Sequence, residues 1–342
     1  MVLIPEAVLL GKECYELYKQ VLIHCGEMKN RIGIFDLYDG YRSRGEGDDP
    51  IDFFRENIGT DFLSYAAAYY PWLHTTLVQK GEVSFRNLDP EIDLESIPPE
   101  PNAQKLMLEF PKNEADFRIA FQKEFPNISQ IPKVAFNDFV NQKKDHLHLG
   151  LMATSPTYGS ILEEIRSMMN LLPAAAALAG VYTMVDNNRG VWKSPANVSL
   201  NAVIKPAVEI SHEGQENLNV HVSGKSINAI RTFPGVGTLV WGARTLDGNS
   251  LDWRYINVRR TIIMLEQSIK LALQSYVFEP NDANTWVTVK SMIVSFLTEK
   301  WKQGALAGSS PEDAFEVQIS LGATMTGLDI LQGKMLVSVK LA

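Results

Sequence analysis

The chain has 342 residues, of which 45% are hydrophobic, enough apolar content for the cores of one large domain or two. Acidic residues outnumber basic ones 40 to 32, and the resulting formal charge of -8 disfavours a protein that wraps nucleic acid, because phosphate binding needs a basic surface. No apolar run is long enough to span a bilayer, and the N-terminus lacks the basic start and apolar stretch of a secretory signal.

The first part of the chain predicts alternating helices and strands. Pro5–Lys29 carries apolar residues at helical spacing, and the apolar run 32–36 that follows ends at a carboxylate, Asp36. After a glycine-rich polar loop, we expect a short helix over Asp52–Asn57 and a buried strand over Ser64–Leu73. This order is typical of an α/β layer.

The composition changes between Gln79 and Ser160. Six acids, one arginine and four prolines lie between Gly81 and Pro101, which predicts an exposed and partly extended segment. Asn113 can cap a short helix, and another short helix is expected after Pro132. This region is therefore predicted to be an insertion with a small core of its own.

From Ser160 to Ala243 we expect two helices followed by strands. Ser160 can cap the first helix, and Pro173 suits the first turn of the second, which runs to about Met184. The strands are expected over Ala202–Val208, Leu218–Val222, Ile227–Arg231 and Thr238–Ala243, of which the last two form a β-hairpin.

The last part predicts two amphipathic helices and two strands. Apolar residues recur at spacings of three and four from Val258 to Tyr276, and Pro280 ends this helix. Asn281 or Asp282 can cap the next helix, which runs to about Gln303. The strands are expected over Ala314–Leu321 and Met335–Leu341.

Few residues of the chain carry a pattern typical of chemistry. Asp36 ends a strand at the edge where open α/β sheets bind ligands, but the interpretation that it caps the following loop is favoured. His146 and His148 could share a metal on a strand, but no third ligand is evident, so a solvated loop is favoured. Cys14 and Cys25 are expected to be buried free thiols. We predict no catalytic residue, no metal site and no cofactor.

Several stretches together carry a resemblance to a known family. They are NRIGIFDL (Asn30–Leu37) with SYAAAYYPWL (Ser64–Leu73), LAGVYTMVDNNRGVWKSPAN (Leu178–Asn197), INAIRTFPGVGTLVWGARTL (Ile227–Leu246), and DWRYINVRRTIIMLEQSI (Asp252–Ile269) with FEPND (Phe278–Asp282) and FLTEKWKQGAL (Phe296–Leu306). These stretches resemble the contractile tail sheath proteins of myophages, R-type pyocins and extracellular contractile injection systems. They follow one another in the family's order and cover most of the chain outside Gln79–Ser160.

The resemblance implies an α/β plus α+β fold. Residues 1–78 and 161–200 are expected to form an N-terminal α/β sheath domain, and 79–160 an outward-facing variable insertion. Residues 201–342 are expected to form a C-terminal α+β sheath core, in which two long helices pack a small β-sheet. Compared with the family, an extended N-terminal arm and a final C-terminal strand are missing, so we expect a trimmed core that stays monomeric or weakly associated.

The implied function is mechanical. Sheath subunits stack as hexameric rings into a helical tube around an inner tube, and on triggering they contract and drive that tube through a target envelope. The implied partners are further copies of the chain, the inner tube protein, and baseplate and terminal cap proteins, with no nucleic acid and no membrane insertion. The implied location is the cytoplasm of a bacterium or phage-infected host during assembly, and then the tail or injection particle, which can be released from the cell.

Two sets of residues are candidates for assembly contacts. The charged side chains Arg259, Arg260, Lys290, Lys300 and Lys302 could face neighbouring subunits or an acidic inner tube, or could form an ordinary solvated helix face. In the family, terminal arms add strands to sheets of neighbouring subunits. The candidate receiving sheet is formed by Ile227, Ile230, Leu239, Trp241, Leu336, Val337 and Val339.

Two other functions remain open at this point. One is a hydrolase-like enzyme that uses the N-terminal α/β layer, with Asp36 and either His146 or His148. The other is a different structural subunit, such as a baseplate or capsid component.

Overall fold

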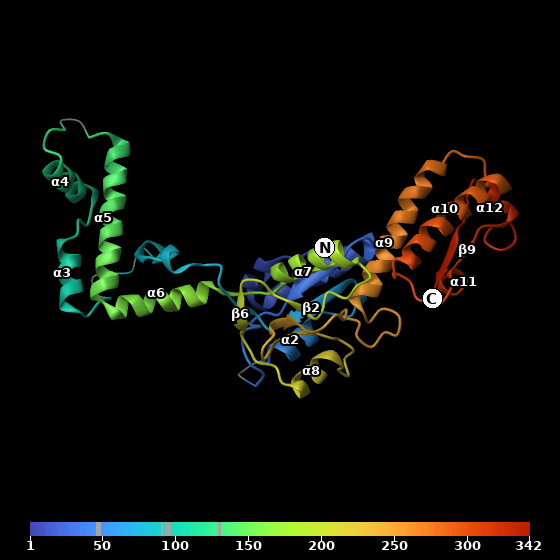
Figure 1. Cartoon of the computed structure of the whole chain (residues 1–342), viewed down its shortest axis with the longest axis horizontal. Helices are drawn as coiled ribbons and strands as arrows, with labels where there is room; N and C mark the ends of the chain where they lie inside the picture. Colours follow the sequence, from blue (N-terminus) through green and yellow to red (C-terminus); the bar gives the residue numbers. More distant parts are fainter. Residues whose placement is uncertain (46–48, 90–91, 93–96, 129–130) are drawn as a thin grey trace. The chain divides into compact units, whose positions relative to one another are not determined.

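The computed structural model describes residues 1–45, 49–89, 92, 97–128 and 131–342 (Figure 1). The chain divides into two units. The main unit comprises Met1–Leu73 and Pro173–Ala342, and the inserted unit comprises His74–Leu172. Each unit is described by itself below.

A five-stranded sheet forms the centre of the main unit, in the order β1-β2-β7-β8-β5. The pairs β1–β2 and β2–β7 are parallel, and β7–β8 and β8–β5 are antiparallel. The strands are β1 (Gly33–Asp36), β2 (Ala66–Tyr70), β5 (Val198–Ser199), β7 (Asn228–Phe233) and β8 (Gly237–Val240).

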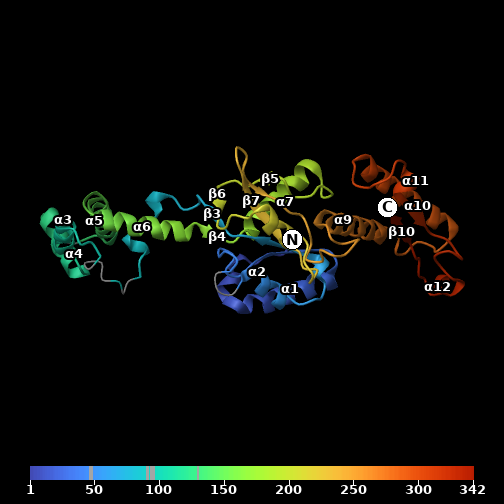
Figure 2. The ribbon, with the colours of Figure 1, turned by 90° about the horizontal axis from the view of Figure 1, so that it is seen from below.

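Helices cover both faces of this sheet. Side chains alternate along β1, so that Phe35 faces the core formed with α1, α2 and α8, while Ile34 faces the core formed with α7 and the start of α9. Figure 2 shows α1 and α2 on one side of the sheet and α7 on the other. Because both faces are covered, every residue of β1 and β2 is buried, as in the α/β layers of other proteins.

The remaining elements of the main unit precede, join or follow these layers, and those labelled η are 3₁₀ helices. They are η1 (Pro5–Glu13), α1 (Cys14–Met28), α2 (Pro50–Asn57), η2 (Leu63–Tyr65), α7 (Ala175–Arg189), β6 (Val203–Pro206), α8 (His212–Asn219), α9 (Ile256–Leu273), η6 (Gln274–Tyr276), α10 (Ala283–Lys302), α11 (Pro311–Ala314), β9 (Phe315–Gln318), α12 (Gly327–Leu331) and β10 (Ser338–Leu341).

The C-terminal part of the main unit has a separate core. The strands β9 and β10 form a two-stranded antiparallel sheet, and its apolar side chains pack with those of α9 and α10. The buried members of this core include Leu265, Val289, Ile293, Leu297, Phe315 and Val317. The expected α/β layer and the small sheet packed by two long helices are both present, which confirms the predicted fold class.

The inserted unit is mainly helical. Its elements are β3 (Leu73–Thr75, which begins at the last residue of the preceding segment), η3 (Lys80–Glu82), η4 (Phe85–Asn87), α3 (Pro101–Glu109), α4 (Glu114–Glu124), α5 (Lys133–Thr154), α6 (Pro156–Met169) and β4 (Leu171–Leu172). It has two small cores, one between α3, α5 and α6 and the other between α4 and the first turns of α5. Part of the acidic segment 81–101 lies outside the described residues.

Three expectations about local structure are wrong. His146 and His148 lie on α5, which continues far beyond the short helix expected after Pro132 because Leu147 and Leu151 extend its apolar side. The helix expected to be capped by Ser160 begins at Pro156, and Ser155 caps it by accepting a hydrogen bond from the backbone N–H of Tyr158.

The segment Leu218–Val222 was expected to be a strand, but Leu218 lies in helix α8. Ser211 caps this helix by accepting a hydrogen bond from the N–H of Gly214 at 3.0 Å, and Gln215 and Leu218 form its buried side. Among the described residues, no helix is both long and apolar enough to cross a membrane.

Candidate functional site

The small sheet β9–β10 is the candidate site for assembly. Val339 lies opposite Val317, and Lys340 lies opposite Glu316, with a 2.9 Å ion pair across the strands. Neither strand pairs with a third one in the part of the chain that the structure describes, so each has an outer edge open to strand addition.

The direction of the backbone groups along β10 follows from one hydrogen bond. The N–H of Ala342 donates to the carbonyl of Ala314 on the β9 side, at 3.0 Å. Because N–H groups alternate along a strand, those of Leu341 and Val339 point toward the outer edge. Val339 therefore presents a main-chain donor on the edge and a half-buried side chain on the core of α9 and α10.

Two further residues of the candidate receiving sheet, Leu336 and Val337, lie immediately before β10. Val337 packs against the same C-terminal core, while Leu336 is 44% exposed. Their participation in strand exchange stays a prediction.

The hairpin β7–β8 does not have the free edge that was expected. It lies between β2 and β5 in the middle of the five-stranded sheet. Ile227, Ile230 and Leu239 are buried, and Trp241 is half-buried with its ring 4.5 Å from that of Phe233. The expectation that this hairpin receives a strand is wrong, because strands of the same chain already pair with both of its edges.

The burial of Arg260 corrects a second expectation. Arg260 is only 9% exposed and forms an ion pair with Asp186 of α7, with one Nη–Oδ1 distance of 2.9 Å. Its guanidinium also lies 4.8 Å from the centre of the Tyr182 ring. The hydroxyl of Tyr182 is hydrogen-bonded at 2.7 Å to that of Tyr69 on β2. Arg260 thus joins the start of α9 to α7 and, through the two tyrosines, to the sheet.

Arg259 is buried as well, at 7% exposure. Its guanidinium is 4.3 Å from the centre of the Tyr65 ring and 3.5 Å from that of Trp253, and it donates a 2.8 Å hydrogen bond to Ser64. Burial lowers the pKa of Arg259. Arg259 and Arg260 therefore do not lie on the outer face of the helix. Their cationic groups lie near the positive end of the α9 dipole, where aromatic faces and one carboxylate offset the unfavourable charge.

The lysines of α10 have the surface position that was expected. Lys290 and Lys302 are exposed. Lys300 is half-buried, with its ammonium 5.9 Å from the centre of the Trp192 ring and 3.1 Å from the side-chain oxygen of Gln303. Contact of these lysines with a neighbouring subunit or an inner tube stays a prediction.

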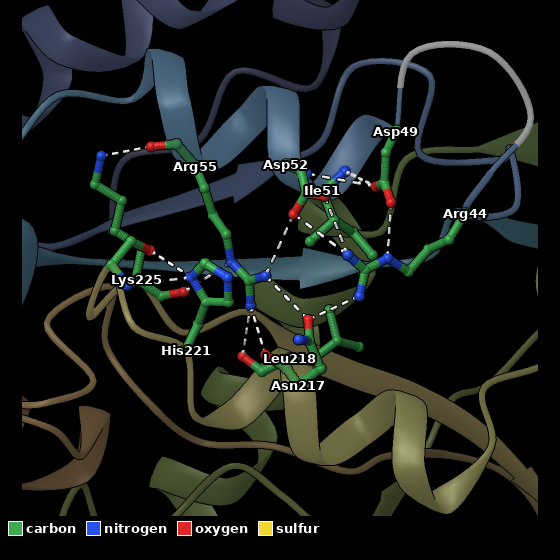
Figure 3. A network of polar contacts seen from close by, with 10 residues as sticks. Arg44, Asp49, Ile51, Asp52, Arg55, Asn217, Leu218, His221 and Lys225 are labelled. Atoms are coloured by element: carbon green, nitrogen blue, oxygen red, sulfur yellow. Dashed lines mark hydrogen bonds and ion pairs between the residues drawn. The ribbon is translucent and has the colours of Figure 1, made fainter.

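A polar network that the sequence analysis missed joins α2 to α8 and to the segment that follows it (Figure 3). Arg55 is 3% exposed and donates to the carbonyls of Asn217 at 2.7 Å, Leu218 at 3.5 Å and Lys225 at 3.2 Å. The Lys225 ammonium in turn donates to the carbonyl of Arg55. Burial lowers the pKa of Arg55 to about 10. An arginine in an isolated amphipathic helix gives no signal of this role, because its partners are carbonyls about 160 residues away in the chain, as the sequence separations of 162 to 170 show.

Replacing Arg55 with leucine is expected to lower the free energy of unfolding by about 3 kcal/mol, because three carbonyls lose their donor. Arg44, whose side chain is 37% exposed, forms ion pairs with Asp49 and Asp52 and is the matched control. Arg44→Ala is expected to cost less than about 1 kcal/mol, as for other exposed ion pairs. Urea unfolding followed by circular dichroism measures both, and equal losses would contradict this assignment.

Asp36, the residue of the hydrolase hypothesis, lies between the sheet and α7. Its Oδ1 accepts a 2.9 Å hydrogen bond from the N–H of Ala175 at the start of that helix, while its Oδ2 is buried and makes no hydrogen bond with any residue that the structure describes. Burial raises the pKa of Asp36 to about 7, and hydrogen bonds from the N–H groups of Ala174 and Ala175 partly oppose this rise.

The histidines of that hypothesis belong to the inserted unit. His148 makes a 2.9 Å hydrogen bond with the hydroxyl of Tyr158 on α6. Among the described residues, no three His, Cys, Asp or Glu side chains are grouped so that they could hold a metal ion. Cys14 and Cys25 are buried free thiols, and burial raises the pKa of both.

Comparison with known proteins finds similarity to tail sheath proteins. Residues 249–340, which include α9, α10 and the β9–β10 sheet, match the phage tail sheath C-terminal domain. This part of the chain is similar to the C-terminal domain of phage tail sheath proteins. Tail sheath proteins of Vibrio phage KVP40 and Enterobacteria phage T4 are 30% and 25% identical over 130 and 126 residues, 37% of this chain and 19% of each relative.

Solved structures of a sheath complex and of a baseplate match nearly the whole chain. The sheath complex of an extracellular contractile injection system, PVC, in the contracted state has a TM-score of 0.61 at 28% identity, covering 96% of this chain and 64% of that one. The baseplate of the anti-feeding prophage in the contracted state has a TM-score of 0.60 at 30% identity, covering 95% and 64%. The chain thus spans less than two thirds of these relatives. The similar proteins are thus tail sheath proteins of phages and components of a sheath complex and of a baseplate.

Proposed function

We propose that this chain forms the body of a subunit that polymerises into a contractile sheath around an inner tube and contracts to drive that tube through a target envelope. Its partners are further copies, in hexameric rings stacked helically, together with the inner tube, baseplate and terminal cap proteins. Assembly takes place in the cytoplasm of the bacterium or infected host, and the subunit is then part of the tail or of a released particle. Similarity to a sheath complex and to a baseplate, both in contracted states, supports this proposal.

The observation that carries the proposal is the β9–β10 sheet. A two-stranded sheet with open outer edges is a site for a strand from another chain, because added strands gain main-chain hydrogen bonds without a large docked surface. Asymmetric contacts of this kind do not close on themselves and generate open helical assemblies. The energy of contraction then comes from changed contacts between rigid subunits.

The cores of the main unit suit such a mechanical role. The buried arginines of α9 and the Arg55 network hold secondary structures of the main unit to one another with hydrogen bonds and ion pairs. A subunit that is moved by its neighbours transmits force only if its own elements do not shift. We propose that the outer face of α10, with Lys290 and Lys302, contacts the inner tube or a neighbouring subunit.

Strand addition can be tested at Val339. The protein, with any sequence that flanks this chain in its gene, is expressed alone and viewed by electron microscopy, where regular tubes are expected. Val339→Pro removes the outward N–H and is expected to abolish tubes, because proline cannot donate to an added strand.

The control is Val339→Ala, which shortens the side chain but keeps the N–H, and it is expected to form tubes. Thermal unfolding of the two variants checks that both are folded. Regular tubes from the proline variant would contradict strand addition at this edge. Absence of tubes from the unaltered protein, together with particles of another form, would instead favour a baseplate or capsid subunit.

A further inference from the structure

The inserted unit contains a groove between α4 and the first half of α5. Its volume is about 630 Å³, within the range of ordinary ligand sites. It is lined by Phe110, Pro111, Lys112, Asn113, Glu114, Phe117, Arg118, Ile131, Lys133, Phe136, Asn137, Val140 and Lys144. This groove lies wholly within the inserted unit and is separate from the β9–β10 sheet.

The floor of the groove is apolar. Phe117 and Phe136 are 7% and 8% exposed and belong to the small core between α4 and α5. Phe110 packs edge-on against Phe117, with a 5.4 Å distance between ring centres and an interplanar angle of 84°. The phenylalanine rings thus contribute apolar edges rather than broad exposed faces.

The rim of the groove is cationic. It carries Lys112, Arg118, Lys133 and Lys144 and one acidic residue, Glu114, which is paired with Arg118 at 2.7 Å. Lys133 and Lys144 form no ion pair with any residue that the structure describes. Residues 74–172 are acidic overall, with 14 Asp and Glu against 10 Lys and Arg, so these four cations are concentrated against the charge of their surroundings.

We propose that this groove binds a short acidic segment of a partner protein. An apolar side chain of the segment lies on the floor, and flanking carboxylates pair with Lys133 and Lys144. Asn137, an exposed amide on the same side of α5, can pair with the main chain of the segment. Because the rim of the groove is cationic, an acidic segment complements its charge.

The same geometry disfavours sugars and nucleic acids as ligands. Single-stranded nucleic acids stack their bases on exposed aromatic faces, and sugar rings pack on apolar faces in the same manner. The rings of Phe117 and Phe136 are buried, and the guanidinium of Arg118 already lies 5.2 Å from the centre of the Phe136 ring. An extended peptide needs only an apolar depression and flanking charges.

The test uses the full chain and a fluorescein-labelled peptide of alternating glutamate and leucine, with binding followed by fluorescence anisotropy. Binding is expected, and it is expected to weaken as sodium chloride is added. The double variant Lys133→Glu/Lys144→Glu is expected to bind at least about tenfold more weakly, because two attractive charges become repulsive. Lys123→Glu, an exposed change on α4 outside the groove, is the matched control and is expected to bind as the unaltered chain does.

Other outcomes would overturn the proposal. An equal affinity for the peptide with glutamine in place of glutamate would show that charge does not contribute to binding. Unchanged binding by the double variant would show that the peptide does not bind in the groove. Tighter binding of alginate oligomers than of the peptide would assign the groove to acidic polysaccharides. Self-association of the chain in sedimentation equilibrium that the double variant abolishes would assign it to a second copy. Circular dichroism and thermal unfolding establish that the variants are folded.

Discussion

Replacing Asp186 with alanine is expected to lower the free energy of unfolding by about 3 kcal/mol, since it leaves the Arg260 cation buried without its counter-ion. Arg260 is 9% exposed, and Asp186 is its ion-pair partner on α7. The loss is measured by urea unfolding of the full chain. Because this pair joins α9 to the layer that covers the central sheet, the same variant is expected to assemble poorly.

The control is an exposed acid at the turn before α9. Asp252→Ala is expected to change stability by less than about 0.5 kcal/mol, as surface substitutions usually do. The double variant Asp186→Leu/Arg260→Met, which replaces the pair with apolar side chains, is expected to recover most of the loss. A cost below about 1 kcal/mol for Asp186→Ala would show that the pair does not anchor the helix.

The second large effect is a dependence of stability on pH that Asp36 causes. The pKa of Asp36 is about 7 in the folded chain, against an ordinary value of 3.8, because the carboxyl group is buried. The folded state therefore binds this proton more tightly than the unfolded state. Its stabilising contribution is complete below about pH 4 and is lost as the pH rises through about 7.

Asparagine at position 36 keeps the oxygen that accepts from Ala175 and has no charge at any pH. The stability of Asp36→Asn relative to the unaltered chain is therefore expected to rise by about 2.5 kcal/mol between pH 5 and pH 8. Urea unfolding of both proteins at several pH values measures this difference in unfolding free energy. Taking the difference cancels the contributions of all other titrating groups, which both proteins share. For Asp61→Asn, a change at an exposed residue that serves as the control, the unfolding free energy is expected to follow that of the unaltered chain at every pH. If the difference between Asp36→Asn and the unaltered chain did not change with pH, this would contradict a pKa of Asp36 that burial raises.

Local signals in the sequence were reliable where the partners lie close along the chain. Asn113 caps α4 by accepting from the N–H of Asp116, as predicted. Asp282, one of the two predicted caps, caps α10 by accepting from the N–H of Thr285. The hairpin β7–β8 was predicted from its strand propensity and its glycine-containing turn. These features depend on interactions within a few residues, which composition and spacing record directly.

Helix α5 of the inserted unit shows where such signals fail. The stretch that contains His146 and His148 is polar and has too few apolar residues to predict a helix. It nevertheless lies on α5. Its helical state depends on Leu147 and Leu151, which pack against residues of α3 and α6. The packing of a long helix against neighbours outweighs the polar character of one of its turns.

The sequence by itself revealed the similarity to tail sheath proteins, the alternation of helices and strands, and the small sheet with its two long helices. Those properties are encoded in the periodicity of apolar residues, in capping residues and in long stretches that resemble tail sheath proteins. Only the tertiary structure decided which of the candidate contact residues are available. Arg259 and Arg260 lie on sides of α9 that Tyr65, Tyr182 and Asp186 cover, and the β7–β8 hairpin is enclosed between two strands. Burial of a charge or of a strand edge depends on segments far away in the chain, so a local pattern does not reveal it.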